Sequence, residues 1–185
     1  MAPDPEFTRQ SPWLDLVNSQ SWDGFGRLTD YLRDPEWVRR FLAYWRPRPP
    51  NAITTAFAEL SDYRTVLRGI AERVARTGSL GTGDFPVLNA ALGAPAYQRV
   101  VRRGDAPSLE LAPVRADWTW IRSQLAASLV VSARDRPRRV KICPNPGCRW
   151  VFLDATKGNT RRWCNDARCG NRDRVRRARA RQTPR

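Results

Sequence analysis

The chain has 185 residues, which suffice for one ordinary globular core and one small module but not for two large domains. It contains no histidine, which excludes Ser-His-Asp and Cys-His nucleophilic chemistry and every metal site that needs an imidazole ligand. Lysine and arginine number 33 against 18 aspartates and glutamates, a net charge of +15. Residues 137–185 carry 15 basic and 3 acidic side chains, so +12 of that charge lies in the last quarter of the chain and predicts an anionic partner there.

The first residues show no apolar periodicity. Residues 1–12, which begin Met-Ala-Pro-Asp-Pro, are expected to be a disordered leader or a tag remnant outside the fold. A signal peptide would place basic residues before an apolar run, and a membrane helix would need about 20 apolar residues; the sequence has neither pattern. We therefore expect a cytoplasmic protein with no membrane contact.

Residues 13–136 are predicted to form a mainly helical domain. Apolar residues at mixed three and four spacings predict short helices over residues 13–45, the last opening near Pro35. A stiff proline-rich linker at residues 46–50 follows, and Asn51 is a good N-cap for a long helix that Gly78 would end.

The rest of this domain is predicted to add a short helix, a hairpin and a last helix. The short helix is expected over residues 85–92, and the hairpin between Tyr97 and Ala112 around a Gly-Asp turn. Asp117 is positioned to cap the last helix. Six tryptophans of the domain are expected in its core rather than in a ligand site, because most lie on apolar helical faces; they are Trp13, Trp22, Trp37, Trp45, Trp118 and Trp120.

All four cysteines lie in one window of 27 residues, as two pairs of Cys-x4-Cys spacing separated by fifteen residues. Two such pairs can bring four thiolates to about 2.3 Å from one zinc ion. Disulfides are the alternative, but a chain without an export signal stays where thiols are reduced. The sequence therefore predicts one zinc ion, and four thiolates leave no position for a reactive water, so the metal would be structural. The predicted ligands are Cys143, Cys148, Cys164 and Cys169.

The cysteine module, residues 137–185, is predicted to be a treble-clef-like zinc finger. A Pro- and Gly-rich knuckle joins the first pair, and residues 150–153 are expected to form a hairpin with residues 161–163. A basic helix should begin at the second pair and run to about Arg181. The fold class is therefore α+β and mainly helical, with a helical N-terminal domain that carries a β-hairpin and a C-terminal finger.

The basic helix is expected to bind a polyanion, because Asp173 is the one acid available to seven arginines between residues 168 and 181. Duplex DNA fits best, since arginine binds phosphates and can also bind guanine edges. The choice of arginine is not itself informative, because 31 of the 33 basic residues of the chain are arginine. An acidic protein surface, or a solvated tail, would also accommodate the charge. The candidate nucleic-acid contacts are Lys157, Arg161, Arg162, Arg168, Asn171, Arg172, Arg174, Arg176, Arg177 and Arg179.

Residues 143–179 closely resemble the bacterial CGNR zinc-finger family. The resemblance rests on the four cysteines in register with Phe152-x-Asp154, the run Arg161-Arg-Trp-Cys164 and the run Cys169-Gly-Asn-Arg172. In that family an ABATE domain, associated with stress-responsive transcription regulators, precedes the finger, and residues 13–136 resemble it more weakly. The resemblance implies a zinc site at the four cysteines and a DNA-binding role for the finger. Between the last two cysteines this chain has Asn-Asp-Ala, where family members often carry an apolar residue.

The leading hypothesis is thus a bacterial transcription regulator that binds duplex DNA through a zinc-supported basic helix. One alternative is a protein-interaction module in which the finger binds an acidic surface of the transcription machinery. Another is RNA binding, which would need exposed aromatic side chains such as Trp150 and Trp163 for base stacking. An enzyme is not expected, because no set of acid, base and nucleophile can be assembled from the sequence.

Overall fold

The computed structural model describes residues 7–8, 10–45, 55–135 and 138–182. The linker expected at residues 46–50 and the N-cap expected at Asn51 lie outside them. The described chain forms helices and two-stranded antiparallel sheets. In chain order these are α1 (Pro12–Asn18), β1 (Gln20–Trp22), β2 (Leu28–Asp30), a 3-10 turn (Tyr31–Arg33), α2 (Pro35–Trp45), α3 (Ala56–Thr77), α4 (Asp84–Leu92), β3 (Ala96–Arg103), β4 (Ala106–Pro113), α5 (Trp118–Asp135), β5 (Val140–Ile142), β6 (Val151–Leu153), a π-helical turn (Asp166–Gly170) and α6 (Asn171–Gln182).

The centre of the core is α1, a short helix that is apolar on nearly every side and is therefore enclosed. Its Trp13, Leu14, Leu16 and Val17 are wholly buried, and it packs against α3, α5 and β6. The Trp13 indole N–H donates to the Ser132 hydroxyl on α5, at 2.9 Å, so the buried ring leaves no unpaired donor. The core prediction is confirmed for Trp13, Trp37, Trp118 and Trp120, which are buried, and for Trp45, which packs against the core. It is wrong for Trp22, which lies outside the core with Arg68 and Arg149 against its ring.

Two of the predicted helix ends are confirmed, at Gly78 and at Asp117. Helix α3 stops at Gly78, whose φ of +84° is a left-handed conformation that favours glycine. The Asp117 side chain accepts from the Trp120 N–H at 3.1 Å and so caps α5. The predicted hairpin forms as β3 and β4, with Val100 opposite Leu109.

The short helices predicted over residues 13–45 are present as α1 and α2, and α2 begins at Pro35 as expected, but the prediction missed two strands between them. Strands β1 and β2 pair between α1 and α2, with Ser21 opposite Thr29. Each strand has three residues, too few for a two-residue alternation to stand out from the helical spacing around it. The loop between them holds Gly24 and Gly26 at φ +91° and +100°.

The described part of residues 1–12 belongs to the fold, contrary to the expectation of a disordered leader there. The Phe7 ring packs against Trp37, Phe41 and Tyr44, with ring centroids 5.7, 6.3 and 5.4 Å apart. The Gln10 side chain pairs with the backbone of Leu153. Aromatic packing and hydrogen bonds thus hold Phe7, Thr8 and Gln10 against the folded domain.

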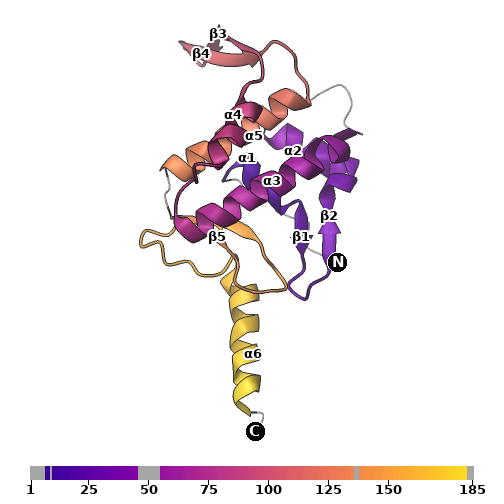
Figure 1. Ribbon diagram of the computed structural model, residues 1–185, viewed down its shortest axis with the longest axis vertical. Coiled ribbons are helices and arrows are strands. Elements are labelled where there is room, and N and C mark those ends of the chain that lie inside the picture. Colours follow the sequence, from indigo (N-terminus) through magenta and orange to yellow (C-terminus); the bar gives the residue numbers. More distant parts are fainter. Residues whose placement is uncertain (1–6, 9, 46–54, 136–137, 183–185) are drawn as a thin grey trace.

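The β3–β4 hairpin and α6 project from opposite ends of the helical body (Figure 1). Three apolar side chains share one face of the hairpin and are largely exposed: Val100, Leu109 and Leu111. Helix α6 extends from the body without packing on the large helices (Figure 1). In the described residues, no helix combines the length and the apolar character needed to cross a membrane.

Candidate metal centre and basic helix

The first cysteine pair sits at the turn of a small hairpin. Strand β5 pairs with β6, Lys141 opposite Phe152, and the Cys143 N–H donates to the Trp150 carbonyl at 2.8 Å. The Asn145 side chain accepts from the Gly147 N–H, and the Asn145 carbonyl accepts from the Cys148 N–H at 2.9 Å. These bonds bend the Cys-Pro-Asn-Pro-Gly-Cys segment into the predicted knuckle.

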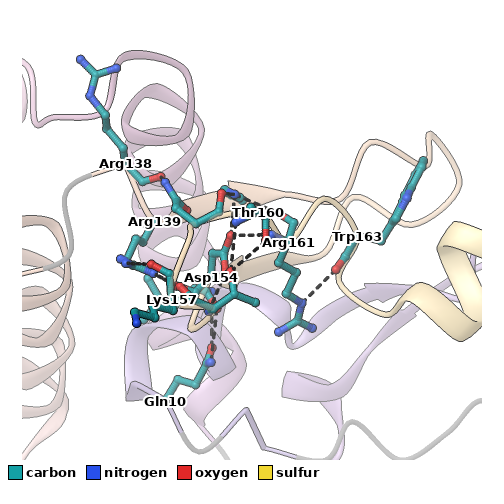
Figure 2. Close-up of polar contacts among 12 residues, drawn as sticks. Gln10, Arg138, Arg139, Asp154, Lys157, Thr160, Arg161 and Trp163 are labelled. Atoms are coloured by element: carbon teal, nitrogen blue, oxygen red, sulfur yellow. Dashed lines mark hydrogen bonds and ion pairs between the residues drawn. The ribbon is translucent and has the colours of Figure 1, made fainter.

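The prediction that residues 150–153 pair with residues 161–163 is wrong, because the partner strand is β5 and residues 161–163 form no strand. The segment after β6 is instead organised around Asp154, whose side chain is fully buried (Figure 2). Its carboxylate accepts from the Lys141 ammonium at 2.6 Å, from the Arg161 N–H at 2.8 Å, and from the Thr156 N–H and hydroxyl. Hydrogen bonds to a buried carboxylate, and not pairing with a strand, therefore hold the segment that follows β6.

The Asp154 carboxyl is ionised in this setting. Burial alone raises the pKa of Asp154, but the hydrogen bonds from Lys141, Thr156 and Arg161 outweigh it and hold the pKa below its ordinary value. The Lys141 ammonium also donates to the carbonyls of Asn159 and Arg161, at 2.7 and 2.9 Å. The ion pair between the half-buried Lys141 and the buried Asp154 thus fixes both ends of the loop that leads to the second cysteine pair.

The second cysteine pair lies in the π-helical turn before α6 and at its entry. The Asn165 side chain accepts from the Arg168 N–H at 2.9 Å, and the Asn165 carbonyl accepts from the Cys169 N–H at 2.8 Å. The Arg161 guanidinium donates to the carbonyls of Trp163 and Cys164. Arg161, a candidate nucleic-acid contact, is therefore engaged in shaping the cysteine loop (Figure 2).

The four cysteine sulfurs converge as a zinc site requires. Their Sγ atoms lie within 4.8 Å of one another, and none is in a disulfide. The Sγ atom of Cys164 is 3.5 Å from that of Cys148 and 3.7 Å from that of Cys169. Thiolates 2.3 Å from a tetrahedral zinc ion are about 3.8 Å apart, so these separations fit one.

The environment of the sulfurs also fits a divalent cation. Hydrogen bonding and repulsion from Cys143 and Cys148 raise the pKa of the Cys164 thiol, so four thiolates need a compensating charge. The Asn145 side-chain amide donates to the Cys169 sulfur at 3.7 Å, and the Trp163 ring packs against the cluster. A closed shell of four thiolates makes one structural zinc ion the group these residues suit.

Helix α6 begins at Asn171, two residues after the fourth cysteine, and the predicted basic helix is confirmed. Asp173 is buried, and its two oxygens receive Arg176 at 2.5 Å and Arg177 at 2.6 Å. The Arg174 guanidinium pairs with Asp166 at 3.2 Å, a pair in which both side chains are more than half exposed.

The other candidate contacts divide into one docked and several exposed side chains. Arg172 is half-buried and donates to the carbonyl of Asp23, in the loop between β1 and β2, at 3.0 Å. The remaining candidates are exposed on the finger or on α6: Lys157, Arg162, Arg168, Asn171 and Arg179.

Two family models match the chain. Residues 10–136 match the ABATE model, described as "Putative stress-induced transcription regulator", and residues 139–182 match the CGNR zinc finger. The chain belongs to the ABATE family. The CGNR finger follows the ABATE domain in the order that the sequence resemblance implied, and no curated protein matches the chain.

The ABATE domain and the CGNR finger share one hydrophobic core. Val140, Val151 and Leu153 of the β5–β6 hairpin are buried in the cluster formed by α1, α3 and α5. The Asn18 side chain, at the end of α1, pairs with both the N–H and the carbonyl of Val151, at 3.0 and 2.8 Å. Sequence reasoning did not identify this role for Asn18, because a lone asparagine at a helix end carries no signal of its distant partner.

Proposed function

We propose that this protein is a transcription regulator whose CGNR finger binds duplex DNA through α6, with the zinc ion in a structural role. The observation that carries the proposal is the charge on α6. Six of its twelve residues are arginine and one is acidic, and the helix extends from the body into solvent (Figure 1).

The geometry of the ion pairs supports a polyanionic partner. Asp173 is shared between Arg176 and Arg177, while their guanidinium groups stay more than half exposed. Each guanidinium has five N–H donors, so both retain donors for phosphate oxygens after pairing with Asp173. The shared carboxylate neutralises one of the two charges and holds both side chains on the same side of the helix.

The same helix is poorly suited to an ordinary protein interface. Val175 is the one sizeable apolar residue on α6, and it is 42% exposed. Stable protein interfaces depend on buried aromatic and apolar anchors at their centre, which α6 does not offer. RNA stacking on Trp163 is disfavoured as well, since that ring is buried beside the cysteines.

The test is the salt dependence of binding to duplex DNA. We expect the zinc-loaded protein to bind a labelled random-sequence duplex at about 150 mM salt, with an affinity that falls linearly with salt on logarithmic axes. Arg177→Gln and Arg181→Gln should each lower the slope by about 0.9 for the lost phosphate contact.

The matched control is Arg102→Gln, since Arg102 is exposed on β3 at the opposite end of the molecule. Its slope should equal that of the wild type. Wild-type protein that fails to bind the duplex, but co-purifies with one acidic protein, would overturn the proposal in favour of a protein-interaction module.

A further inference from the structure

The loop between β1 and β2, residues 23–27, is closed by hydrogen bonds between its own residues. The Asp23 side chain accepts from the N–H groups of Phe25 and Arg27, at 2.7 and 3.2 Å, and the Asp23 N–H donates to the Arg27 carbonyl at 3.1 Å. The positive φ angles of Gly24 and Gly26 are strained for residues with a side chain. The loop is therefore held in one tight conformation with Phe25 at its tip.

This loop of the ABATE domain is attached to the CGNR finger at two points. The Gly24 N–H donates to the Gly147 carbonyl in the zinc knuckle at 2.9 Å, and Arg172 at the start of α6 donates to the Asp23 carbonyl at 3.0 Å. A Cβ atom on Gly147 would lie 2.6 Å from the Gly24 carbonyl oxygen, so the two backbones approach as closely as glycine allows. The loop and the base of α6 thus lie side by side, at the same end of the molecule (Figure 1).

The tip of the loop exposes its aromatic ring to solvent. Phe25 is 81% exposed, more than any other large apolar side chain in the described residues. The Arg172 guanidinium carbon lies 4.3 Å from the ring centroid, a cation–π contact that orients the ring beside the first turn of α6. A single exposed apolar side chain is common on protein surfaces. The Phe25 ring differs in its setting, because a hydrogen-bonded loop carries it and an arginine lies against its face, beside the first turn of α6.

The charges around Phe25 indicate a partner with negative charge. The ring lies on a cleft of 1410 Å³ between the loop and the finger, lined among the described residues by four arginines and one acid, Asp23. One Asp23 oxygen is occupied by the loop N–H groups. One of the arginines, Arg168, has no carboxylate partner within the described chain. An apolar protein surface would not compensate these charges, whereas duplex DNA offers phosphates and, where a base step is partly unstacked, the flat faces of two bases.

We propose that Phe25 is a stacking residue that packs on a base step of duplex DNA, next to the groove that α6 enters. The inference rests on the proposed function and adds to it an ABATE-domain residue in the interface. Proteins that bind the minor groove of DNA insert apolar side chains, phenylalanine included, between neighbouring base pairs, and their basic side chains contact the DNA nearby. Arg172 links the two elements, because it holds the loop and starts the helix.

An uncharged contact has a distinct signature in a salt titration. Removing Phe25 weakens binding at every salt concentration without releasing fewer counterions, so the logarithmic slope stays that of the wild type. Removing a phosphate-binding arginine lowers the slope. The two kinds of contact can therefore be separated in one experiment on the full chain.

The experiment compares wild type, Phe25→Ala, Phe25→Trp and Val100→Ala on one labelled random-sequence duplex between ~50 and ~200 mM salt. We expect Phe25→Ala to bind about 5-fold more weakly with an unchanged slope, the lower end of the range for base–aromatic stacking on single strands, because insertion into a duplex also has to unstack a base step. Phe25→Trp should restore binding to the wild-type level, because it keeps the aromatic face. Val100 is 72% exposed at the far end of the molecule, so Val100→Ala should bind like the wild type.

Each other outcome overturns the inference in a recognisable way. Equal affinity of wild type and Phe25→Ala would assign Phe25 to a partner other than DNA and leave the proposed function standing. A lower slope for Phe25→Ala, with zinc content and circular dichroism unchanged, would mean that the ring positions Arg172 and does not stack. Wild-type protein that does not bind the duplex would overturn the inference and the proposed function together.

Discussion

At the residue scale, Asp154 is the most deeply buried of the three acids in residues 137–185, and its contacts stabilise the finger. It is fully buried and binds Lys141, Thr156 and the backbone of Arg161. Removing one partner of a buried ion pair leaves the other unpaired at a cost of several kcal/mol. We expect Asp154→Asn to lower the free energy of unfolding by about 3 kcal/mol, measured by urea denaturation of the zinc-loaded protein.

Asp166→Asn is the matched control, because Asp166 is an exposed carboxylate in the same module whose partner, Arg174, is also exposed. An exposed pair contributes below about 1 kcal/mol, so this variant should unfold near the wild-type midpoint. Equal destabilisation by the two substitutions would contradict the role given to Asp154.

The pH dependence follows from the same contacts. Because the folded-state pKa of Asp154 is depressed below its ordinary value of 3.8, the carboxylate adds stability that is present above that value. The added stability is lost as the pH falls below 3.8 toward the folded-state pKa. The difference in stability between wild type and Asp154→Asn should accordingly shrink on acidification within that range.

At the scale of elements, side chains form the hydrogen bonds on the edge of β6 that faces away from β5, where a third strand would otherwise bind. Its inner edge pairs with β5, and the outward N–H and carbonyl of Val151 bind the amide of Asn18. The amide of Gln10 binds Leu153 in the same way, at 3.3 and 3.4 Å. Two carboxamides thus satisfy a strand edge that the fold buries, as buried backbone groups require.

We expect Asn18→Ala to destabilise the protein by about 3 kcal/mol, since it leaves a buried N–H and a buried carbonyl of Val151 unpaired. Hydrogen exchange should show faster exchange of the Val151 amide in the variant. The matched comparison is Gln10→Ala, which removes two longer bonds between a half-buried side chain and the backbone of Leu153, and it should cost less, about 1 kcal/mol, because water can reach the half-buried position of Gln10. Unchanged exchange at Val151 in Asn18→Ala would show that the amide does not pair the strand edge.

The elements that the sequence predicted are those whose signal is local. Periodic apolar residues with Gly78 and Asp117 as caps located α3 and α5, and the cysteine spacing located the metal site. The β5–β6 pairing was missed because the contacts that favour it are distant in sequence: Val140, Val151 and Leu153 are buried against other helices, and Asp154 binds Lys141, 13 residues away. The apolar run at residues 150–153 predicted a strand, but no local sequence pattern indicated whether β5 or residues 161–163 would pair with it.

At the scale of the whole molecule, the ABATE and CGNR models match separate stretches of the sequence, but the main hydrophobic core contains residues of both. The β5–β6 hairpin contributes Val140, Val151 and Leu153 to the main core, while the cysteines form a second, small cluster with Trp163. The finger therefore has one half anchored by hydrophobic packing and another half that depends on the metal.

This division determines what loss of zinc does to the protein. We expect that a chelator will make the amides of residues 143–149 and 160–172 exchange faster with solvent. The amides of β5, β6, α1, α3 and α5 should stay protected, because apolar burial holds these elements without the metal. Cys148→Ser should produce the same pattern. Adding zinc back should restore protection in the chelated wild-type protein but not in Cys148→Ser.

The loop of residues 23–27 is bound to the knuckle and to Arg172, so its amides should also lose protection when zinc is removed. Helix α6 would then leave its position beside Phe25. Uniform loss of protection across the chain would show instead that the metal supports the main core, and unchanged protection would show that the cysteine cluster folds without it.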